Sequence, residues 1–338
     1  MTRVVVFGAG AIGTFLGGVL AHAGHEVTLI GREHAMESLT QAGALRLTDY
    51  RSLDIRVPLP ELTTSPEALG QAELILLTVK CLGVHEAAQY LRAWAPPTAT
   101  VLCLQNGLGS EQSLQGLPQT IVRGIFGANI APQGPGHFHR GTEGDVWTEP
   151  YADVGGLNHA FQQAHFALQQ THRYEALAWA KLQLNLNNAI NALSDLPLKA
   201  ELEQRDYRRV LAAAMNELIA ITDCYQLRLP RLTKLPARWI PRLLTIPDGW
   251  FKRLAGSMLA IDPQARSSMW EDLNQQRMTE VPYINGAVVE AGRHLGIATP
   301  VNAWLVEQIE AVERRHQLPG ISAQEMLREI RQRQRTKP

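Results

Sequence analysis

The chain has 338 residues, which is long enough for two domains that each bury a hydrophobic core. It carries 32 Lys and Arg against 32 Asp and Glu, and this balance argues against binding to nucleic acid or to an anionic membrane. The scattered cysteines Cys81, Cys103 and Cys224 have no metal-ligand spacing, so we expect a cytoplasmic protein without a disulfide framework or a metal site. After the N-terminal stretch, no apolar run approaches the roughly 18 residues of a membrane span.

The first predicted elements form a nucleotide-binding unit. Residues 4–7 read as a buried parallel strand, residues 12–23 as a helix and residues 26–30 as a second strand. The turn between the first strand and the helix reads Gly8, Ala9, Gly10, Ala11, Ile12 and Gly13. Glycines at this spacing let the chain turn sharply, offer backbone N–H groups to a pyrophosphate and press the helix against the sheet. A secretory signal ending at 21–23 is the alternative, but its cleavage would remove the first strand of the sheet.

The residue after the second predicted strand indicates which dinucleotide binds. Units that bind NAD usually place Asp or Glu there, where the carboxylate holds the ribose 2′-hydroxyl. This chain instead reads Ile30-Gly31-Arg32. An arginine pairs with a 2′-phosphate and stacks on adenine, which favours NADP(H). The alternative is that Arg32 is a solvated loop residue beside Glu33.

Strand-like and helical segments continue to alternate up to about residue 170, which predicts an α/β domain with a doubly wound parallel sheet. Further strands are expected at residues 73–80, 100–105 and 121–130, with short antiparallel strands at 134–141 and 145–148 closing the sheet. Lys80 and Asn106 fall at two strand ends, the position at which such sheets meet their ligand. We therefore expect both to face the nicotinamide half of the cofactor, while Asn106-Gly107 also fits a plain turn.

The second half of the chain has helical periodicity, so we predict a Rossmann domain at residues 1–170 and an all-helical domain at 171–338. Helices are expected at residues 174–193, 201–225, 267–295 and 302–314, with short helical turns over the Pro- and Trp-rich segment 229–263. Residues 323–338 are expected to form a charged helix that ends in a solvated tail.

The first of these helices carries an unusual set of polar residues. Asparagine is a mediocre helix former, yet Asn185, Asn187, Asn188 and Asn191 lie close together. At about 100° per residue, Lys181, Asn185 and Asn188 share one face, and the opposite face is apolar. A lysine there is suited to protonate a developing alkoxide, and amides are suited to hold a substrate carbonyl, carboxylate or hydroxyl. The alternative is that Lys181 is an ordinary surface lysine.

Two more candidates follow in the predicted helix 267–295. Ser268 and Glu271 have the spacing of a capping box, which is a sufficient structural explanation of Ser268. Glu280 stands beside the apolar Val281, a setting for a partly buried carboxylate, and Pro282 is expected to kink the helix. Spacing alone leaves Glu280 as either a site residue or a part of the helix.

In order along the chain, these motifs resemble those of the ketopantoate reductases (2-dehydropantoate 2-reductases), whose helical second domain is of the 6-phosphogluconate-dehydrogenase type. The resemblance covers nearly the whole chain. The matching signatures are the glycine motif, Arg32, Thr78-Val79-Lys80, Gln105-Asn106-Gly107, Lys181-Leu182 with Asn185, Ser267-Ser268-Met269, and Thr279-Glu280 ahead of Ile284-Asn285-Gly286.

The resemblance implies an NADPH-dependent oxidoreductase that reduces 2-dehydropantoate to pantoate, a precursor of pantothenate and coenzyme A. It implies that Lys181 is the general acid, that Glu280 binds and orients the substrate, and that Asn185 and Ser268 contact it. Because Asn188 lies on the same helix face as Lys181, we expect it to contact the substrate as well. The resemblance also implies that Lys80 and Asn106 face the cofactor and a cleft between the domains.

The sequence departs from the family pattern at two places. Ala189 occupies a position where the family commonly has a second helix asparagine, and Ala265 and Arg266 replace another asparagine before the serine pair. These departures leave the identity of the 2-keto acid open. The alternatives are a reductase of another branched 2-keto acid and a non-catalytic NADP(H)-binding regulator, although a regulator would not need both Lys181 and Glu280. The oligomeric state is also open, with a homodimer as one option.

Overall fold

The computed structural model divides the chain into two compact units. The first unit comprises Met1–Asn106 and Ser110–Tyr174, and the second comprises Gly107–Gly109 and Glu175–Pro338. The structure describes residues 1–153, 156–254, 256 and 263–335. The boundary lies at the first residue of a helix, slightly later than residue 170. Among the helices of the described ranges, none combines the length and the apolar character that a membrane span requires.

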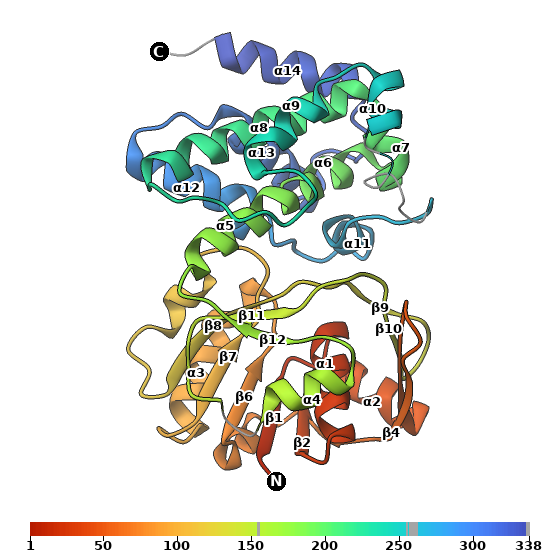
Figure 1. Ribbon diagram of the computed structural model, residues 1–338, viewed down its shortest axis with the longest axis vertical. Coiled ribbons are helices and arrows are strands. Elements are labelled where there is room, and N and C mark those ends of the chain that lie inside the picture. The colour runs from red at the N-terminus through yellow and green to blue at the C-terminus, as the bar shows by residue number, and fades with distance from the viewer. Residues whose placement is uncertain (154–155, 255, 257–262, 336–338) are drawn as a thin grey trace. The chain divides into compact units, whose positions relative to one another are not determined.

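The first unit is built around an eight-stranded sheet with the order β12-β11-β8-β7-β6-β1-β2-β5 (Figure 1). Its strands are β1 (Arg3–Phe7), β2 (Glu26–Ile30), β5 (Glu61–Thr63), β6 (Leu74–Leu77), β7 (Thr100–Cys103), β8 (Thr120–Phe126), β11 (Val146–Thr148) and β12 (Leu168–Gln170). From β5 to β8 all neighbours pair in parallel, in the doubly wound order of dinucleotide-binding folds. The order reverses between β1 and β6, so a ligand is expected at their carboxyl ends.

Both faces of this sheet are covered, as the residues of β1 illustrate. Val4 and Val6 pack on one face and Val5 and Phe7 on the other, and all four are buried. Helices α1 (Ala11–His22), α2 (Glu33–Ala42) and α4 (Leu157–Gln163) cover the first face, and Figure 1 shows α1 and α4 on its near side. The second face is covered by α3 (Val84–Trp94) and by the 3₁₀ turns η1 (Pro66–Gln71) and η3 (Ser110–Leu114).

A second sheet, with the order β4-β3-β10-β9, corrects the prediction for residues 134–141. Its strands are β3 (Ala44–Asp49), β4 (Asp54–Pro58), β9 (Ile130–Pro132) and β10 (His137–Arg140). β10 does not close the main sheet, because it pairs in parallel with β3, a strand far away in the sequence. The predicted strand 121–130 is likewise divided between β8 and β9, which belong to different sheets. β11 does join the main sheet, antiparallel to β8.

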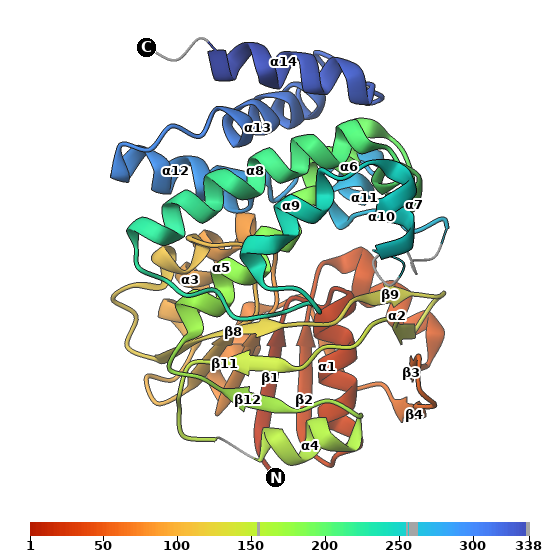
Figure 2. The same cartoon turned by 45° about the horizontal axis from the view of Figure 1, so that its top comes forward.

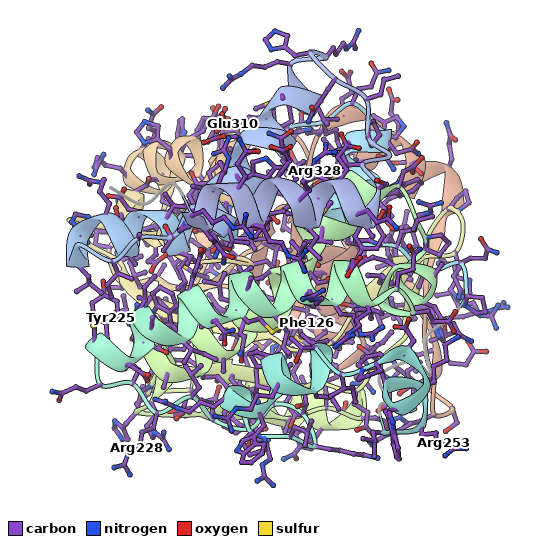
Figure 3. The ribbon with its side chains drawn as sticks, turned by 90° about the horizontal axis from the view of Figure 1, so that it is seen from above. Phe126, Tyr225, Arg228, Arg253, Glu310 and Arg328 are labelled. Atoms are coloured by element: carbon purple, nitrogen blue, oxygen red, sulfur yellow. The ribbon has the colours of Figure 1, made fainter. Side chains whose placement is uncertain are left out.

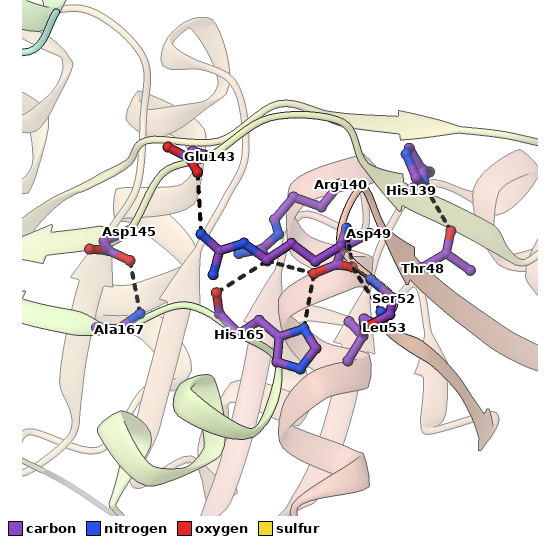
Figure 4. A network of polar contacts seen from close by, with 11 residues as sticks. Thr48, Asp49, Ser52, Leu53, His139, Arg140, Glu143, Asp145, His165 and Ala167 are labelled. Carbon is purple, nitrogen blue, oxygen red and sulfur yellow. Dashed lines mark hydrogen bonds and ion pairs between the residues drawn. The ribbon is translucent and has the colours of Figure 1, made fainter. Parts of the chain in front are cut away.

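Asp49, at the end of β3, ties the second sheet to the rest of the unit (Figure 4). Its carboxylate accepts hydrogen bonds from the Ser52 and Leu53 N–H groups at 2.7 and 2.8 Å and from the Arg140 guanidinium at 2.8 Å. Nδ1 of His165 lies 3.2 Å away. Burial by itself would raise the pKa of Asp49. The hydrogen bonds from Leu53, Ser52 and Arg140 have the larger combined effect and hold the pKa well below its usual range. The carboxylate therefore stays ionised inside the protein.

The second unit is helical in the part that the structure describes. Its helices are α5 (Tyr174–Asn185), α6 (Asn187–Ser194), α7 (Leu198–Leu202), α8 (Arg205–Cys224), α9 (Ile240–Leu244), α10 (Asp248–Leu254), α11 (Ser268–Asn274), α12 (Asn285–Leu295), α13 (Pro300–Glu313) and α14 (Ala323–Arg335), with the 3₁₀ turns η4 (Ala237–Trp239) and η5 (Val281–Tyr283). Figure 2 shows the long α8 with α9 beside it, and α14 also packs against α8. The shared core is formed mainly by apolar residues of α5, α6, α8, α12, α13 and α14.

Three predicted helices are interrupted in the structure. The prediction 174–193 breaks at Leu186 into α5 and α6, and the prediction 201–225 divides into α7 and α8. The prediction 267–295 is wrong over its centre, where a loop and η5 separate α11 from α12. There Gln276 adopts a left-handed φ of 54°, which ends α11, and Pro282 has no N–H to continue a helix.

The C-terminal helix is not a solvated tail. Met326, Leu327 and Ile330 of α14 are buried and belong to the helical core, whereas Arg328, labelled in Figure 3, lies on the exposed face. Residues 336–338 lie outside the described part of the chain. The predicted short turns within 229–263 are present as η4, α9 and α10, and residues 255 and 257–262 are likewise not described.

Candidate active site

The glycine motif forms the turn from β1 into α1, and it brings the predicted cofactor residues Gly8 to Gly13 together in one turn. Gly8 has a φ of +120°, and a Cβ there would lie 2.4 Å from the backbone nitrogen of Val79. A Cβ on Gly13 would lie 2.2 Å from the carbonyl oxygen of Gly8. Gly10 faces open space and precedes α1 without a side-chain cap, so the first-turn N–H groups of α1 are suited to bind an anion.

Side chains from the neighbouring strand ends support this turn. The Thr78 hydroxyl, just after β6, donates a hydrogen bond to the carbonyl of Gly8 at 2.8 Å. The side-chain amide of Gln105, after β7, donates to the carbonyls of Leu77 and Val79 at 2.8 and 3.1 Å. In the sequence, Thr78 and Gln105 are only parts of motifs. The structure shows that Thr78 binds the end of β6 to the glycine turn and that Gln105 binds the end of β7 to the end of β6.

Arg32, Lys80 and Asn106 lie at the carboxyl ends of parallel strands. Arg32 follows β2, is exposed and precedes the first turn of α2. Lys80 follows β6, and Asn106 follows β7, where its carbonyl accepts a hydrogen bond from the Cys81 thiol at 2.9 Å. Because β2, β1, β6 and β7 are consecutive in the sheet, all three residues lie at the edge that carries the glycine turn.

In the helical unit, Lys181 is half-buried on α5 and lies within electrostatic range of Glu280. Burial lowers the pKa of the Lys181 amine to about 8, and the charge of Glu280 acts in the opposite direction. Such an amine is still mainly protonated at neutral pH, yet it releases its proton more readily than an ordinary lysine. This property suits a general acid.

The backbone around Glu280 is held on both sides. The N–H of the buried Thr279 donates to the Glu313 carboxylate at 2.7 Å, and the Thr279 hydroxyl accepts from the N–H of Val281 at 3.2 Å. The carbonyl of Glu280 itself accepts from the N–H of Tyr283 at 3.0 Å, within η5. The half-buried Glu280 side chain therefore extends from a turn whose backbone is fixed by specific hydrogen bonds.

The structure separates the asparagines into two pairs. Asn187 and Asn191 are buried, and their amide nitrogens donate to the Glu201 carboxyl at 3.4 and 2.9 Å. Asn185 and Asn188 are partly exposed, and within the described residues their side-chain amides make no hydrogen bond. Their amides are therefore able to bind a substrate. The break at Leu186 keeps helical dihedral angles, φ −58° and ψ −23°, so the shared face with Lys181 is largely retained.

Ser267, rather than Ser268, caps α11, so the capping-box interpretation of Ser268 is wrong. The Ser267 hydroxyl accepts from the N–H of Trp270 at 3.1 Å. It also donates to the carbonyl of Asn188 at 3.2 Å, and the Ser267 N–H donates to the side-chain oxygen of Asn191 at 2.8 Å. These contacts with α6 select Ser267 as the cap. Ser268 becomes the exposed first residue of α11.

Together, the doubly wound sheet with its uncapped glycine turn and the helical unit with its desolvated lysine define a pyridine-nucleotide-dependent oxidoreductase. Residues 4–153 match the family described as Ketopantoate reductase PanE/ApbA, and residues 173–313 match its C-terminal part. The chain belongs to this ketopantoate reductase family, which confirms the resemblance and the predicted fold class.

Individual relatives agree with this membership. The 2-dehydropantoate 2-reductase of Halobacterium salinarum is 30% identical over 322 residues, which cover 92% of this chain and 99% of the relative. The crystal structure of a PanE/ApbA family ketopantoate reductase from Ralstonia eutropha JMP134 has a TM-score of 0.79 and 29% identity, and covers 94% of this chain and 100% of that one. A ternary structure of D-mandelate dehydrogenase with NADH and anilino(oxo)acetate shares the fold at 21% identity, with a TM-score of 0.71 and coverage of 93% and 99%.

Proposed function

We propose that this chain reduces 2-dehydropantoate to pantoate with NADPH. Family membership over nearly the whole chain supports this reaction class. The observation that carries the mechanism is the desolvated Lys181, whose helix face also holds the unbonded amides of Asn185 and Asn188. A poorly solvated amine with a lowered pKa, beside amides that can bind a substrate, is what a ketone reduction needs from the protein.

The residues of the first unit fit a pyridine dinucleotide. The turn at Gly8 leaves no room for a Cβ, Gly10 is open, and the uncapped start of α1 suits a pyrophosphate. Arg32 is exposed at the end of β2, the position from which a side chain reaches the adenosine ribose. We propose that it pairs with a 2′-phosphate, so that the cofactor is NADP(H). Lys80 and Asn106 follow β6 and β7, whose carboxyl ends lie at the same edge of the sheet, and we assign them to the nicotinamide side of the cofactor.

The reduction adds a hydride to C2 of the keto acid and a proton to the ketone oxygen. When bound, NADPH supplies the hydride from its nicotinamide ring. Lys181 donates the proton, because it is charged at neutral pH and poorly solvated. Asn185, Asn188 and Ser268 hold the polar groups of the substrate through their amides and hydroxyl. Glu280 accepts a hydrogen bond from the substrate hydroxyl and, by its charge, keeps Lys181 protonated.

The substitutions at Ala189 and Arg266 favour one second candidate, a reductase of another branched 2-keto acid. In the structure Arg266 donates to the carbonyl of Asp195 at 2.9 Å and stacks on Trp270, with its guanidinium carbon 4.1 Å from the ring centre. Arg266 and Trp270 therefore place a cation and an aromatic ring two residues on either side of Ser268 in the sequence. Such groups would favour a 2-keto acid whose side chain differs from that of ketopantoate.

A panel of 2-keto acids that includes ketopantoate tests the proposal, with NADPH consumption followed by absorbance. The highest kcat/KM for ketopantoate supports the proposed reaction. A higher value for another branched 2-keto acid would support the second candidate. Tight NADPH binding without turnover of any keto acid would contradict the proposal and indicate a binding protein that has lost catalysis.

A further inference from the structure

Glu201 on α7 is a fully buried carboxyl that the proposed mechanism does not use. Its Oε2 accepts hydrogen bonds from the amide nitrogens of Asn191 at 2.9 Å and Asn187 at 3.4 Å. Its Oε1 and the Oδ1 of Asn187 are buried, and both lack a hydrogen-bond partner in the described part of the chain. A buried carboxyl that recruits two asparagines needs an explanation beyond packing.

A proton on Glu201 would make its carboxyl a hydrogen-bond donor, with Oδ1 of Asn187 as the acceptor. Burial raises the pKa of Glu201 to about 8, and the hydrogen bonds from Asn191 and Asn187 lower it by less. A neutral carboxyl needs an acceptor for its proton, and Oδ1 of Asn187 is an acceptor in the same cluster. Because the nitrogen and oxygen of an asparagine amide are interchangeable by a flip, Asn187 is able to turn this oxygen toward Glu201.

From Glu201 the hydrogen bonds continue to the start of α11. The Asn191 amide, which donates to Glu201, uses its oxygen to accept from the N–H of Ser267 at 2.8 Å. Ser267 caps α11 and donates from its hydroxyl to the carbonyl of Asn188 at 3.2 Å. The chain of contacts therefore joins α7, α6 and α11, and it ends beside Ser268 in the sequence.

We propose that Glu201 is a positioning residue that, through Asn191 and Ser267, holds Ser268 and Asn188 in place for the substrate. The proposal rests on the proposed function, which takes Ser268 and Asn188 as substrate contacts. Glu201 itself is buried and does not touch the substrate. Its effect should therefore appear in substrate affinity, whereas proton donation by Lys181 and cofactor binding by the first unit should be unaffected.

Glu201→Gln and Glu201→Leu form a matched pair for the test. Glutamine keeps an acceptor for Asn191 and a donor for Asn187, whereas leucine has a comparable size and neither group. We expect Glu201→Leu to raise the KM for ketopantoate about tenfold, with kcat and the NADPH Kd within about twofold of wild type. Glu201→Gln should keep the wild-type KM. A role in folding alone would instead reduce the active fraction, which lowers the apparent kcat and leaves KM unchanged.

A double-mutant cycle identifies the path of the effect. If Glu201 acts through α11, the rise in KM caused by Glu201→Leu should shrink in a Ser268→Ala background. It should stay at its full size in an Asn185→Ala background, because Asn185 lies on α5 and is not bonded to this network. If Glu201→Leu does not fold, Ser267→Ala replaces it in the cycle, since it removes the cap and the bond to Asn188 while leaving the core carboxyl in place.

The outcomes separate this proposal from the proposed function. An enzyme that turns over ketopantoate with the same KM in wild type, Glu201→Leu and Ser267→Ala would overturn the positioning role and leave the function intact. Full additivity with Ser268→Ala would also overturn it. A wild-type protein that reduces no 2-keto acid would overturn the proposed function itself.

Discussion

Lys181 on α5 and Glu280, just before η5, are electrostatically coupled: burial lowers the pKa of the lysine to about 8, and the glutamate charge opposes this decrease. The coupling joins two residues from different helical segments. It limits the decrease in the pKa of Lys181 that burial causes, and it leads to two predictions that differ in their pH dependence.

Lys181→Ala should lower kcat for ketopantoate reduction by about 10²–10⁴-fold, because a positioned general acid contributes that much. NADPH affinity should be preserved, since the glycine turn lies in the other unit. In the wild type, kcat/KM should fall as the pH rises above about 8, where Lys181 loses its proton. Stopped-flow rates and a pH profile check this. A folded variant that retains nearly the wild-type rate would assign the proton to another group, with Lys80 as the next candidate.

Glu280→Gln should reduce turnover strongly and leave the NADPH Kd nearly unchanged. The carboxylate raises the pKa of Lys181, so its removal should lower that pKa and move the alkaline limb of any remaining activity to lower pH. Measuring the pH profile of the variant tests the sign. An unchanged limb in an active variant would show that the two residues are not coupled in solution.

Arg32→Ala should weaken NADPH binding by about 1.5–3 kcal/mol, the contribution of a charge-assisted contact with the 2′-phosphate. NADH has no 2′-phosphate, so its affinity should hardly change. Fluorescence titration of both cofactors against wild type and variant measures the difference. Equal weakening of both cofactors would mean that Arg32 contacts a part of the dinucleotide that they share.

Glu201 should make stability depend on pH. Its folded-state pKa of about 8 lies above the ordinary value of 4.5, so between these values the folded protein keeps a proton that the unfolded chain releases. Because the folded state binds this proton more tightly, the free energy of unfolding falls by on the order of a few kcal/mol as the pH rises from about 4.5 to about 8. Glu201→Gln should lose the dependence and gain stability relative to wild type between pH 5 and pH 8. Urea unfolding at several pH values measures this. If the free energy of unfolding changed with pH in the same way in wild type and Glu201→Gln, the raised pKa of Glu201 would be contradicted.

Asp49→Ala should destabilise the protein by about 3–5 kcal/mol, because it leaves the guanidinium of Arg140 buried without its carboxylate. The matched control is Asp54→Ala, which breaks an exposed pair with Arg46 whose side chains are 44% and 51% accessible. That loss should stay below about 1 kcal/mol. Urea unfolding of the two variants gives the comparison, and equal losses would refute the role of Asp49 as a buried anchor.

The features of this protein that could be predicted from the sequence are those that depend on residues close to one another along the chain. The strand, turn and helix from Arg3 to His22 form one local unit, in which Gly8 and Gly13 are required by contacts within or next to that unit. The shared face of Lys181, Asn185 and Asn188 follows from helical geometry alone. Arg32 at a strand end is equally visible in the order of residues. These local features were sufficient for the fold class, and they supplied most of the residues that we propose for the site.

Contacts between distant segments decided the rest. β10 pairs with β3 instead of the main sheet, Ser267 rather than Ser268 caps α11 because Asn188 and Asn191 bind it, and α14 buries one face in the helical core. The lowered pKa of Lys181 and the raised pKa of Glu201 arise from burial in the folded protein. Desolvation depends on which surfaces meet after folding, and a linear pattern contains no information about the depth at which a charge is buried.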